Sequence, residues 1–180
     1  MHRRALLDLL DGYLPSSTSD AEARERIRAF VEAEPSCFER TTVAGHVTGS
    51  AWIVDPWRTR CLLTHHRKLD RWLQLGGHAD GDPDVQRVAM REAREESGLA
   101  GIRLVDGAIF DCDVHLIPAR GAEAAHWHYD VRFLLEADPA EPLSLSSESK
   151  DLAWVAMQDV PALASDESVA RMVAKTARLR

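Results

Sequence analysis

The sequence GHADGDPDVQRVAMREAREESGL, residues Gly77–Leu99, decides the fold of this 180-residue chain. It begins as a loop rich in glycine and aspartate and continues as a helix expected over residues 84–97. Asp82 and Pro83 are typical of a helix start, because aspartate caps free amides and proline fits the first turn. Gly98 is typical of a helix end, because glycine readily adopts the left-handed conformation found there. The stretch therefore predicts a loop followed by one well-delimited helix.

Carboxylates interrupt the apolar stripe of this expected helix. Because a helix advances ~100° per residue, three apolar residues share one stripe: Val85, Val88 and Ala89. The next members of that stripe are all acidic: Glu92, Glu95 and Glu96. Like charges at this spacing repel, and the repulsion must be offset. Arg91 can pair with Glu95, and a divalent cation bound by the carboxylate oxygens would offset far more. The alternative is an ordinary solvated acidic face paired with neighbouring arginines: Arg87, Arg91 and Arg94. An isolated ExxEE favours that acidic face, but the alignment with the apolar stripe weakens this interpretation.

The spacing around these glutamates resembles the Nudix box, a glycine-led loop followed by REUxEExGU with U aliphatic. Gly77 is followed, after thirteen residues, by REAREESGL at residues 91–99. The match preserves the arginine, the three glutamates and the second glycine at the family spacing. One position departs from the family pattern, which has glutamate six residues after the leading glycine. This chain has Pro83 there, between Asp82 and Asp84.

The resemblance implies a fold of the α/β class (α+β), a Nudix-type mixed β-sheet sandwiched between helices. It also implies a pyrophosphohydrolase that cleaves the diphosphate linkage of a nucleoside diphosphate derivative or a similar small phosphorylated metabolite. By the same resemblance, one or more Mg²⁺ or Mn²⁺ ions would be held by oxygen ligands: Glu92, Glu95, Glu96, Glu148 and the backbone carbonyl of Gly76. Arg91 would fix the glutamates in place. The catalytic residues would then be Glu92, Glu95 and Arg91, with the choice of general base between the two glutamates left open.

Hydrophobic periodicity separates a helical N-terminal extension, residues 1–42, from the strand-rich remainder of the chain. The resemblance implies that this remainder, residues 43–180, is a Nudix hydrolase domain. Two helices are expected in the extension, over residues 2–14 and 20–34. Strands are expected over residues 47–54, 59–64, 102–105, 108–117, 126–136 and 152–156, and a closing helix over 165–179. Residues 118–125 join two of these strands, which are expected to pair as a hairpin.

The two hairpin strands carry polar side chains at every second position. One face is expected to hold Asp111, Asp113 and His115 from the first strand, and His126, His128, Asp130 and Arg132 from the second. This face is either a solvent-facing surface or part of a site, in which His128 and Asp130 would contact substrate or metal. A second metal site built from these histidines is the less favoured reading. His66 and Arg67 precede the glycine loop, where they would meet substrate phosphates.

Composition narrows the class of partner. A net charge of -7 disfavours a nucleic-acid polymer, because phosphate neutralisation needs a basic surface. No apolar run is long enough to cross a membrane, and three separated cysteines are typical of a cytoplasmic protein with reduced thiols. Arginine greatly outnumbers lysine, which points to a GC-rich bacterial genome. The expected partner is a small phosphorylated substrate, and the N-terminal helices would suit a homodimer interface.

Two other functions compete with the hydrolase interpretation. A non-catalytic Nudix-fold nucleotide-binding or regulatory module typically loses box glutamates, whereas this chain keeps three. An isopentenyl diphosphate isomerase-like enzyme also has a Gly-His element after a strand, as at Gly77-His78. That enzyme's pattern places cysteine immediately before this element, and Gly76 stands there in this chain. The group needed for its proton transfer is therefore missing.

Overall fold

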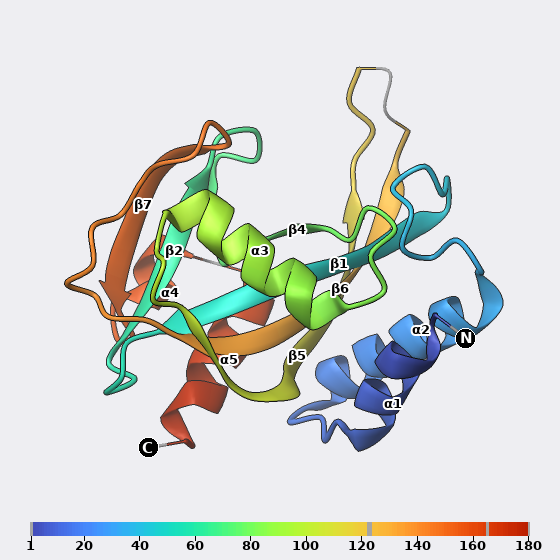
Figure 1. Ribbon diagram of the computed structural model, residues 1–180, viewed down its shortest axis with the longest axis horizontal. Helices are drawn as coiled ribbons and strands as arrows, with labels where there is room; N and C mark the ends of the chain where they lie inside the picture. Colours follow the sequence, from blue (N-terminus) through green and yellow to red (C-terminus); the bar gives the residue numbers. More distant parts are fainter. Residues whose placement is uncertain (1, 122–123, 165, 180) are drawn as a thin grey trace.

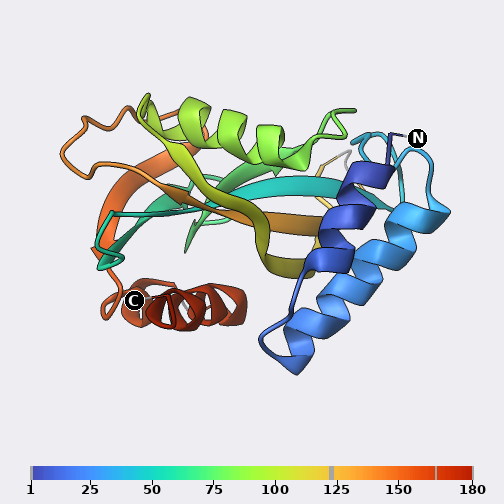
Figure 2. The same cartoon turned by 60° about the horizontal axis from the view of Figure 1, so that its bottom comes forward.

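A mixed sheet covered by helices on both faces forms the body of the protein. The structure is a computed structural model, and it describes residues 2–121, 124–164 and 166–179. Two helices come first, α1 (Arg4–Gly12) and α2 (Thr18–Ala33). Helix α3 (Val85–Ser97) covers one face of the sheet, and α4 (Val160–Leu163) and α5 (Glu167–Ala177) lie on the other (Figure 1, Figure 2). This arrangement confirms the fold class expected from the sequence.

The sheet has seven strands, and its central strand changes partner along its length. The strands are β1 (Gly45–Val54), β2 (Arg60–His66), β3 (Arg71–Leu73), β4 (Leu75–His78), β5 (Arg103–Ile117), β6 (His126–Glu136) and β7 (Ser149–Ala156). The main path runs β3-β2-β1-β6-β5, with β4 paired to β1 and β7 paired to β2. β1 and β6 are parallel, and the other pairs are antiparallel. β1 pairs with β4 at residues 48–51 and with β2 at Val54.

Both faces of β1 are buried, which explains why all ten of its residues are inaccessible to solvent. Val47, Ala51 and Ile53 belong to the apolar cluster that contains the buried residues of α3. Trp52 and Val54 point the other way, into the cluster formed with α4 and α5. The indole nitrogen of Trp52 donates a hydrogen bond to Thr176 Oγ1 at 2.9 Å, so this large buried side chain leaves no polar atom unpaired.

The N-terminal helices pack against β5 and β6 and share the core of the sheet. Their buried residues, among them Leu6, Leu10, Ile27 and Val31, lie in the same apolar cluster as Val47 of β1. Phe30 of α2 stacks on Tyr129 of β6 with ring centroids 3.9 Å apart. The two helices therefore contribute to the same core as the sheet, and the division at residue 42 stays a prediction.

Three local features differ from the sequence predictions. Helix α3 begins at Val85 with Asp84 as its cap, whose side chain accepts a hydrogen bond from the Arg87 amide at 3.0 Å. The expected start at Asp82 and Pro83 is wrong, because Asp82 instead accepts from the Asp84 amide in the preceding turn. Strands β3 and β4 were not expected, since three or four residues are too few to show alternation. The ranges 102–105 and 108–117 form one irregular strand, β5.

Candidate functional site

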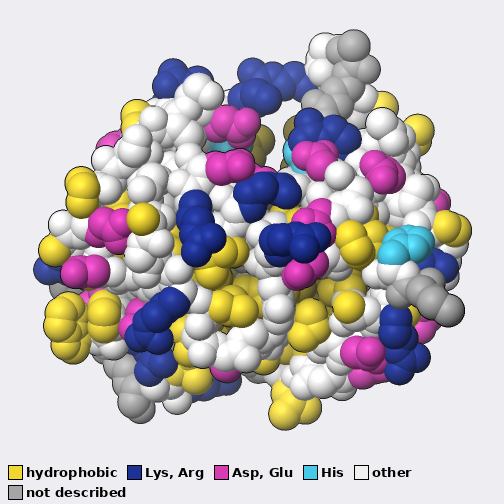
Figure 3. Space-filling view, in the orientation of Figure 1, with side chains coloured by type: hydrophobic (Ala, Val, Ile, Leu, Met, Phe, Trp, Pro, Cys, Tyr) yellow, Lys and Arg dark blue, Asp and Glu magenta, His cyan; other side chains and the backbone are white. Residues whose placement is uncertain are grey.

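A cavity of about 390 Å³ lies beside α3, and most of the predicted site residues line it. These are Gly76, Arg91, Glu92, Glu95, His66, His128, Asp130 and Glu148. They come from β4, α3, β2, β6 and the segment before β7, so the cavity joins parts of the chain that are distant in sequence. Figure 3 shows the molecule in the orientation of Figure 1, and its surface is hollowed above the centre of the view, where acidic, basic and histidine side chains gather.

Glu92 lies in close contact with the glycine loop. A Cβ atom at Gly77 would lie 2.4 Å from Glu92 Oε2, so a larger residue there would displace the carboxylate from its position. Arg91 Nη2 donates to Glu92 Oε1 at 2.7 Å and to the His78 carbonyl at 2.9 Å. The ion pair expected between Arg91 and Glu95 is instead made with Glu92, because Arg91 turns back toward β4. Arg91 therefore fixes a box glutamate to the loop.

The three box glutamates differ in burial. Glu95 is exposed, whereas Glu92 and Glu96 are half-buried where α3 approaches β4. The Gly76 amide donates to Glu96 Oε1 at 3.4 Å, a long bond that compensates the buried carboxylate weakly. Burial, together with Glu92, Glu148 and Glu95 nearby, raises the pKa of Glu96 to about 8. Burial also raises the pKa of Glu92, although Arg91 opposes this change.

This donor set fits a hard divalent cation. The charges of Glu95 and Glu148 raise the pKa values of both Glu92 and Glu96, and Arg91 opposes this effect at Glu92. Buried carboxylates that repel one another are stabilised when a cation binds between them. Oxygen donors of this kind suit Mg²⁺ or Mn²⁺. The residues present therefore fit the metal that the sequence resemblance implies.

The buried Glu96 carboxylate should make the metal-free protein less stable as pH rises. Its pKa is raised from 4.5 to about 8 in the folded chain, so the folded state binds the proton more tightly than the unfolded state. Stability is then lost as pH rises from the unfolded to the folded pKa. In EDTA at pH 8, Glu96→Gln should therefore unfold at a higher temperature than the wild type, by at least roughly 2–4 °C, which corresponds to at least about 1 kcal/mol. At pH 4.5 the variant and the wild type should have the same melting temperature. An equal increase in melting temperature at both pH values would contradict the role of Glu96 ionisation.

The polar face of the hairpin is buried rather than solvent-facing. The observed register pairs Asp111 with Arg132, Asp113 with Asp130 and His115 with His128. Arg132 and Asp130 are each 2% exposed, and Asp111 is fully buried. The alternative of an ordinary solvent-facing surface is therefore wrong, because Arg171 and Lys175 of α5 pack on Asp111 at one end of this face, and the other end, with His115 and His128, lines the cavity.

Asp130 forms the floor of the cavity, and its carboxylate is fully engaged. Thr48 and Ser50 donate to Oδ1 at 2.9 and 2.7 Å. Arg132 and Gln74 donate to Oδ2 at 2.7 and 3.3 Å. With four donors on two oxygens, Asp130 is anchored to β1 and to its own strand. Arg132 was expected on this face without a role, and its contacts with three aspartates mark it as the centre of this network.

His66 and Arg67 behave differently from each other. His66 lines the cavity, and burial lowers its pKa below the ordinary value. Arg67 instead binds the segment before β7. Its amide donates to the Glu148 carbonyl at 2.8 Å, and its guanidinium donates to the Ser147 and Ser149 carbonyls at 3.1 and 2.8 Å. Arg67 thus holds the backbone on both sides of Glu148.

The fold and the carboxylate-lined cavity define an α+β domain of the Nudix type. A family model described as NUDIX domain matches residues 46–176, most of the chain. The chain belongs to the Nudix family.

Similarity to individual proteins agrees with this family. A Mycobacterium tuberculosis protein called Putative 8-oxo-dGTP diphosphatase 3 is 32% identical over 113 residues, 58% of this chain and 48% of that protein. The chain thus spans about half the length of the curated relatives it matches. Among solved structures, an Ap4A hydrolase of C. elegans has a TM-score of 0.60 and 17% identity over 74% of this chain and 96% of that one. A MutT NUDIX hydrolase of Burkholderia pseudomallei has a TM-score of 0.56 and 24% identity over 72% of this chain and 95% of that one. At these identities the solved structures show the shared fold alone.

Proposed function

We propose that the protein is a metal-dependent hydrolase that cleaves the diphosphate linkage of a nucleoside diphosphate derivative or a similar small phosphorylated metabolite. The observation that carries the proposal is that Glu92, Glu95 and Glu148 line one cavity. Glu96 does not line it, but the charges of these three glutamates raise its pKa. The names of the M. tuberculosis relative and the C. elegans structural neighbour refer to nucleotide substrates of this chemical class. The chain also retains all three box glutamates, which disfavours a purely binding role.

The residues of the cavity have two proposed roles, metal binding and positioning. Glu92, Glu95, Glu96, Glu148 and the Gly76 carbonyl would hold Mg²⁺ or Mn²⁺. Such ions, when bound, polarise a phosphoryl oxygen and lower the pKa of a bound water. Arg91 positions Glu92 through the bond already described, and the general base is either Glu92 or Glu95. This assignment makes Glu92, Glu95 and Arg91 the catalytic set.

The substrate-binding assignments follow the same cavity. His66 and His128 line it and have lowered pKa values, so they are neutral near pH 7 and can donate a hydrogen bond to a phosphate or a base. Asp130 holds the floor on which the substrate would lie. Arg67 was expected to contact a phosphate, but it is better suited to positioning Glu148. Its amide and its guanidinium donate hydrogen bonds to backbone carbonyls at and beside that residue.

The cellular setting follows from composition and family. Among the described residues, no helix has the length and apolar character needed to cross a membrane. We propose a cytoplasmic bacterial enzyme acting on a small molecule. A homodimer through the N-terminal helices remains a prediction from the sequence.

The test is a substrate panel with the purified protein. Nucleoside triphosphates, oxidised nucleotides, ADP-ribose, nucleotide sugars, NADH, CoA and dinucleoside polyphosphates would be incubated with Mg²⁺, Mn²⁺ or EDTA, and the released phosphates quantified. We expect turnover of at least one diphosphate-containing compound that EDTA abolishes. Metal-independent turnover would contradict the proposed mechanism. Tight nucleotide binding without turnover of any panel member would favour the binding module instead.

A further inference from the structure

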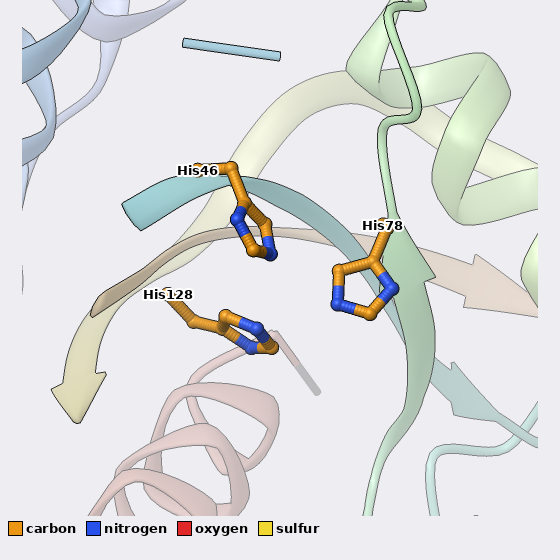
Figure 4. A group of neighbouring side chains, drawn as sticks. All are labelled: His46, His78 and His128. Carbon is orange, nitrogen blue, oxygen red and sulfur yellow. The ribbon is translucent and has the colours of Figure 1, made fainter. Parts of the chain in front are cut away.

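Five histidines gather at one end of the cavity, on the sheet face that carries Asp130. They are His46 of β1, His78 of β4, His115 of β5, and His126 and His128 of β6. The ring centroids of His46, His78 and His128 lie 4.9 to 5.2 Å apart. One nitrogen atom of each ring can serve as a metal ligand, and these three atoms all lie within 4.8 Å of one another. Figure 4 shows the three rings turned toward one shared space, each from a different strand.

The burial of these rings leaves nitrogen atoms without hydrogen bonds. His46 is 2% exposed, and neither of its ring nitrogens has a hydrogen-bond partner. The Nε2 atom of His128 is likewise buried and unpaired. A buried polar atom that lacks a partner is energetically unfavourable. The unpaired nitrogens of His46 and His128 belong to two rings that face one shared space with His78, and they therefore point to a ligand there.

We propose that His46, His78 and His128 form a second metal site, for a nitrogen-preferring transition ion such as Zn²⁺, distinct from the carboxylate site. Imidazole nitrogens suit Zn²⁺ and its neighbours in the first transition row, whereas Mg²⁺ prefers oxygen ligands. Three histidines that leave one position open are a known ligand set for zinc. His78 and His128 also line the cavity, so the open position faces the space where substrate phosphates would bind.

The protonation state of the rings favours metal binding. Burial, reinforced by neighbouring histidines, lowers the pKa of His46 to about 4 and that of His128 to about 2. Both rings are therefore neutral near pH 7, the form that binds metals. Around one tetrahedral Zn²⁺ the ligand nitrogens would lie ~3.4 Å apart, so nitrogens at the 4.8 Å limit would have to approach by about 1.4 Å.

Arg40 determines which nitrogen of His78 is available. Arg40 Nη2 lies 3.0 Å from His78 Nδ1. Ligation through Nε2 places the proton of His78 on Nδ1, so the Arg40 contact must break when metal binds. Arg40 can leave without losing its anchor, because it pairs with both carboxylate oxygens of Asp80, at 2.5 and 2.9 Å. Arg40→Gln is accordingly expected to tighten metal binding rather than weaken it.

Zinc retention by the full chain tests the site. The protein is stripped with EDTA, loaded with Zn²⁺, desalted and analysed for metal content, with affinity measured by calorimetry. We expect about one retained Zn²⁺ per chain, and the same retention in Glu92→Gln, which alters the carboxylate site. His128→Ala and His46→Ala should each bind Zn²⁺ at least about 100-fold more weakly. His65→Ala is the matched control, because His65 stacks on Trp72 outside the cluster.

A wild-type measurement keeps the test decisive if the buried His46 variant fails to fold. X-ray absorption of the Zn²⁺-loaded protein should show imidazole ligands, and Co²⁺ substitution should give the visible spectrum of a low-coordinate nitrogen site. Absence of retained Zn²⁺, or retention unchanged in a folded His128→Ala variant, would overturn the proposal. Mg²⁺-dependent hydrolysis measured without zinc is a separate readout, so the hydrolase assignment stands or falls independently.

Discussion

Glu92→Gln is expected to lower kcat for diphosphate hydrolysis by about 10³-fold or more at saturating Mg²⁺. The substitution keeps the size of the side chain but removes the negative charge that Arg91 fixes beside Gly77. Metal-assisted charge stabilisation contributes several kcal/mol to such reactions, and each 1.36 kcal/mol corresponds to a tenfold change in rate. The decisive measurement is kcat with the substrate found in the panel, at increasing Mg²⁺ and Mn²⁺.

The control for this variant is another glutamate-to-glutamine change outside the cavity. Glu25 of α2 has a side chain that is 58% exposed and pairs with Arg24. Glu25→Gln should therefore keep the wild-type kcat, and circular dichroism should show that both variants fold. If Glu92→Gln retained more than a tenth of the wild-type kcat with wild-type metal affinity, Glu92 would not belong to the catalytic set.

Arg132→Met should cause the largest loss of stability of any single substitution considered for this protein. Arg132 is 2% exposed and contacts Asp130, Asp111 and Asp113 at 2.7, 3.2 and 3.4 Å. Removing one partner of a buried ionic group leaves uncompensated charge and costs about 3–5 kcal/mol. For a chain of this size the melting temperature should fall by roughly 6–20 °C. Asp111 keeps Arg171 and Lys175 of α5, so Asp130 and Asp113 account for most of the loss.

The matching control changes an arginine in an exposed ion pair. Arg4 pairs with Asp8 on the surface of α1, and its side chain is 76% exposed. Solvent screens such exposed pairs, so Arg4→Met should barely shift the melting temperature. Adding Asp130→Asn to Arg132→Met should restore part of the lost stability, because it removes one unpaired charge. Equal losses for Arg132→Met and Arg4→Met would contradict the role assigned to the buried network.

The hairpin of β5 and β6 shows what the alternation of polar side chains along a strand can and cannot predict. Polar residues at every second position placed Asp111, Asp113 and His115 on one face with His128, Asp130 and Arg132, and the observed register pairs them as expected. Alternation alone does not indicate whether this face meets solvent. That depended on β1, which runs parallel to β6 and brings Thr48 and Ser50 onto Asp130. Periodicity specifies which side chains share a face, whereas burial depends on what covers it.

Local sequence by itself determined the element that carries the box glutamates. The apolar stripe and the stop at Gly98 depend on neighbours within a few residues, so helix α3 and the order of its glutamates follow from short-range chemistry, although its cap is Asp84 rather than the expected Asp82. The same applies to the fold class, which the spacing of the box and the succession of strands indicated. The fully buried strand β1 and the two N-terminal helices were also expected, since each is long enough to show its own period.

The tertiary structure alone decided which distant residues meet. His46 and His128 are 82 residues apart in sequence and pair because β1 and β6 lie side by side in parallel register, while β4 brings His78 to the other edge of β1. The burial that raises the pKa of Glu96 and the bonds from Arg67 around Glu148 arise in the same way. No local pattern encodes these contacts, because the packing of sheet and helices sets distances between segments that share no sequence period.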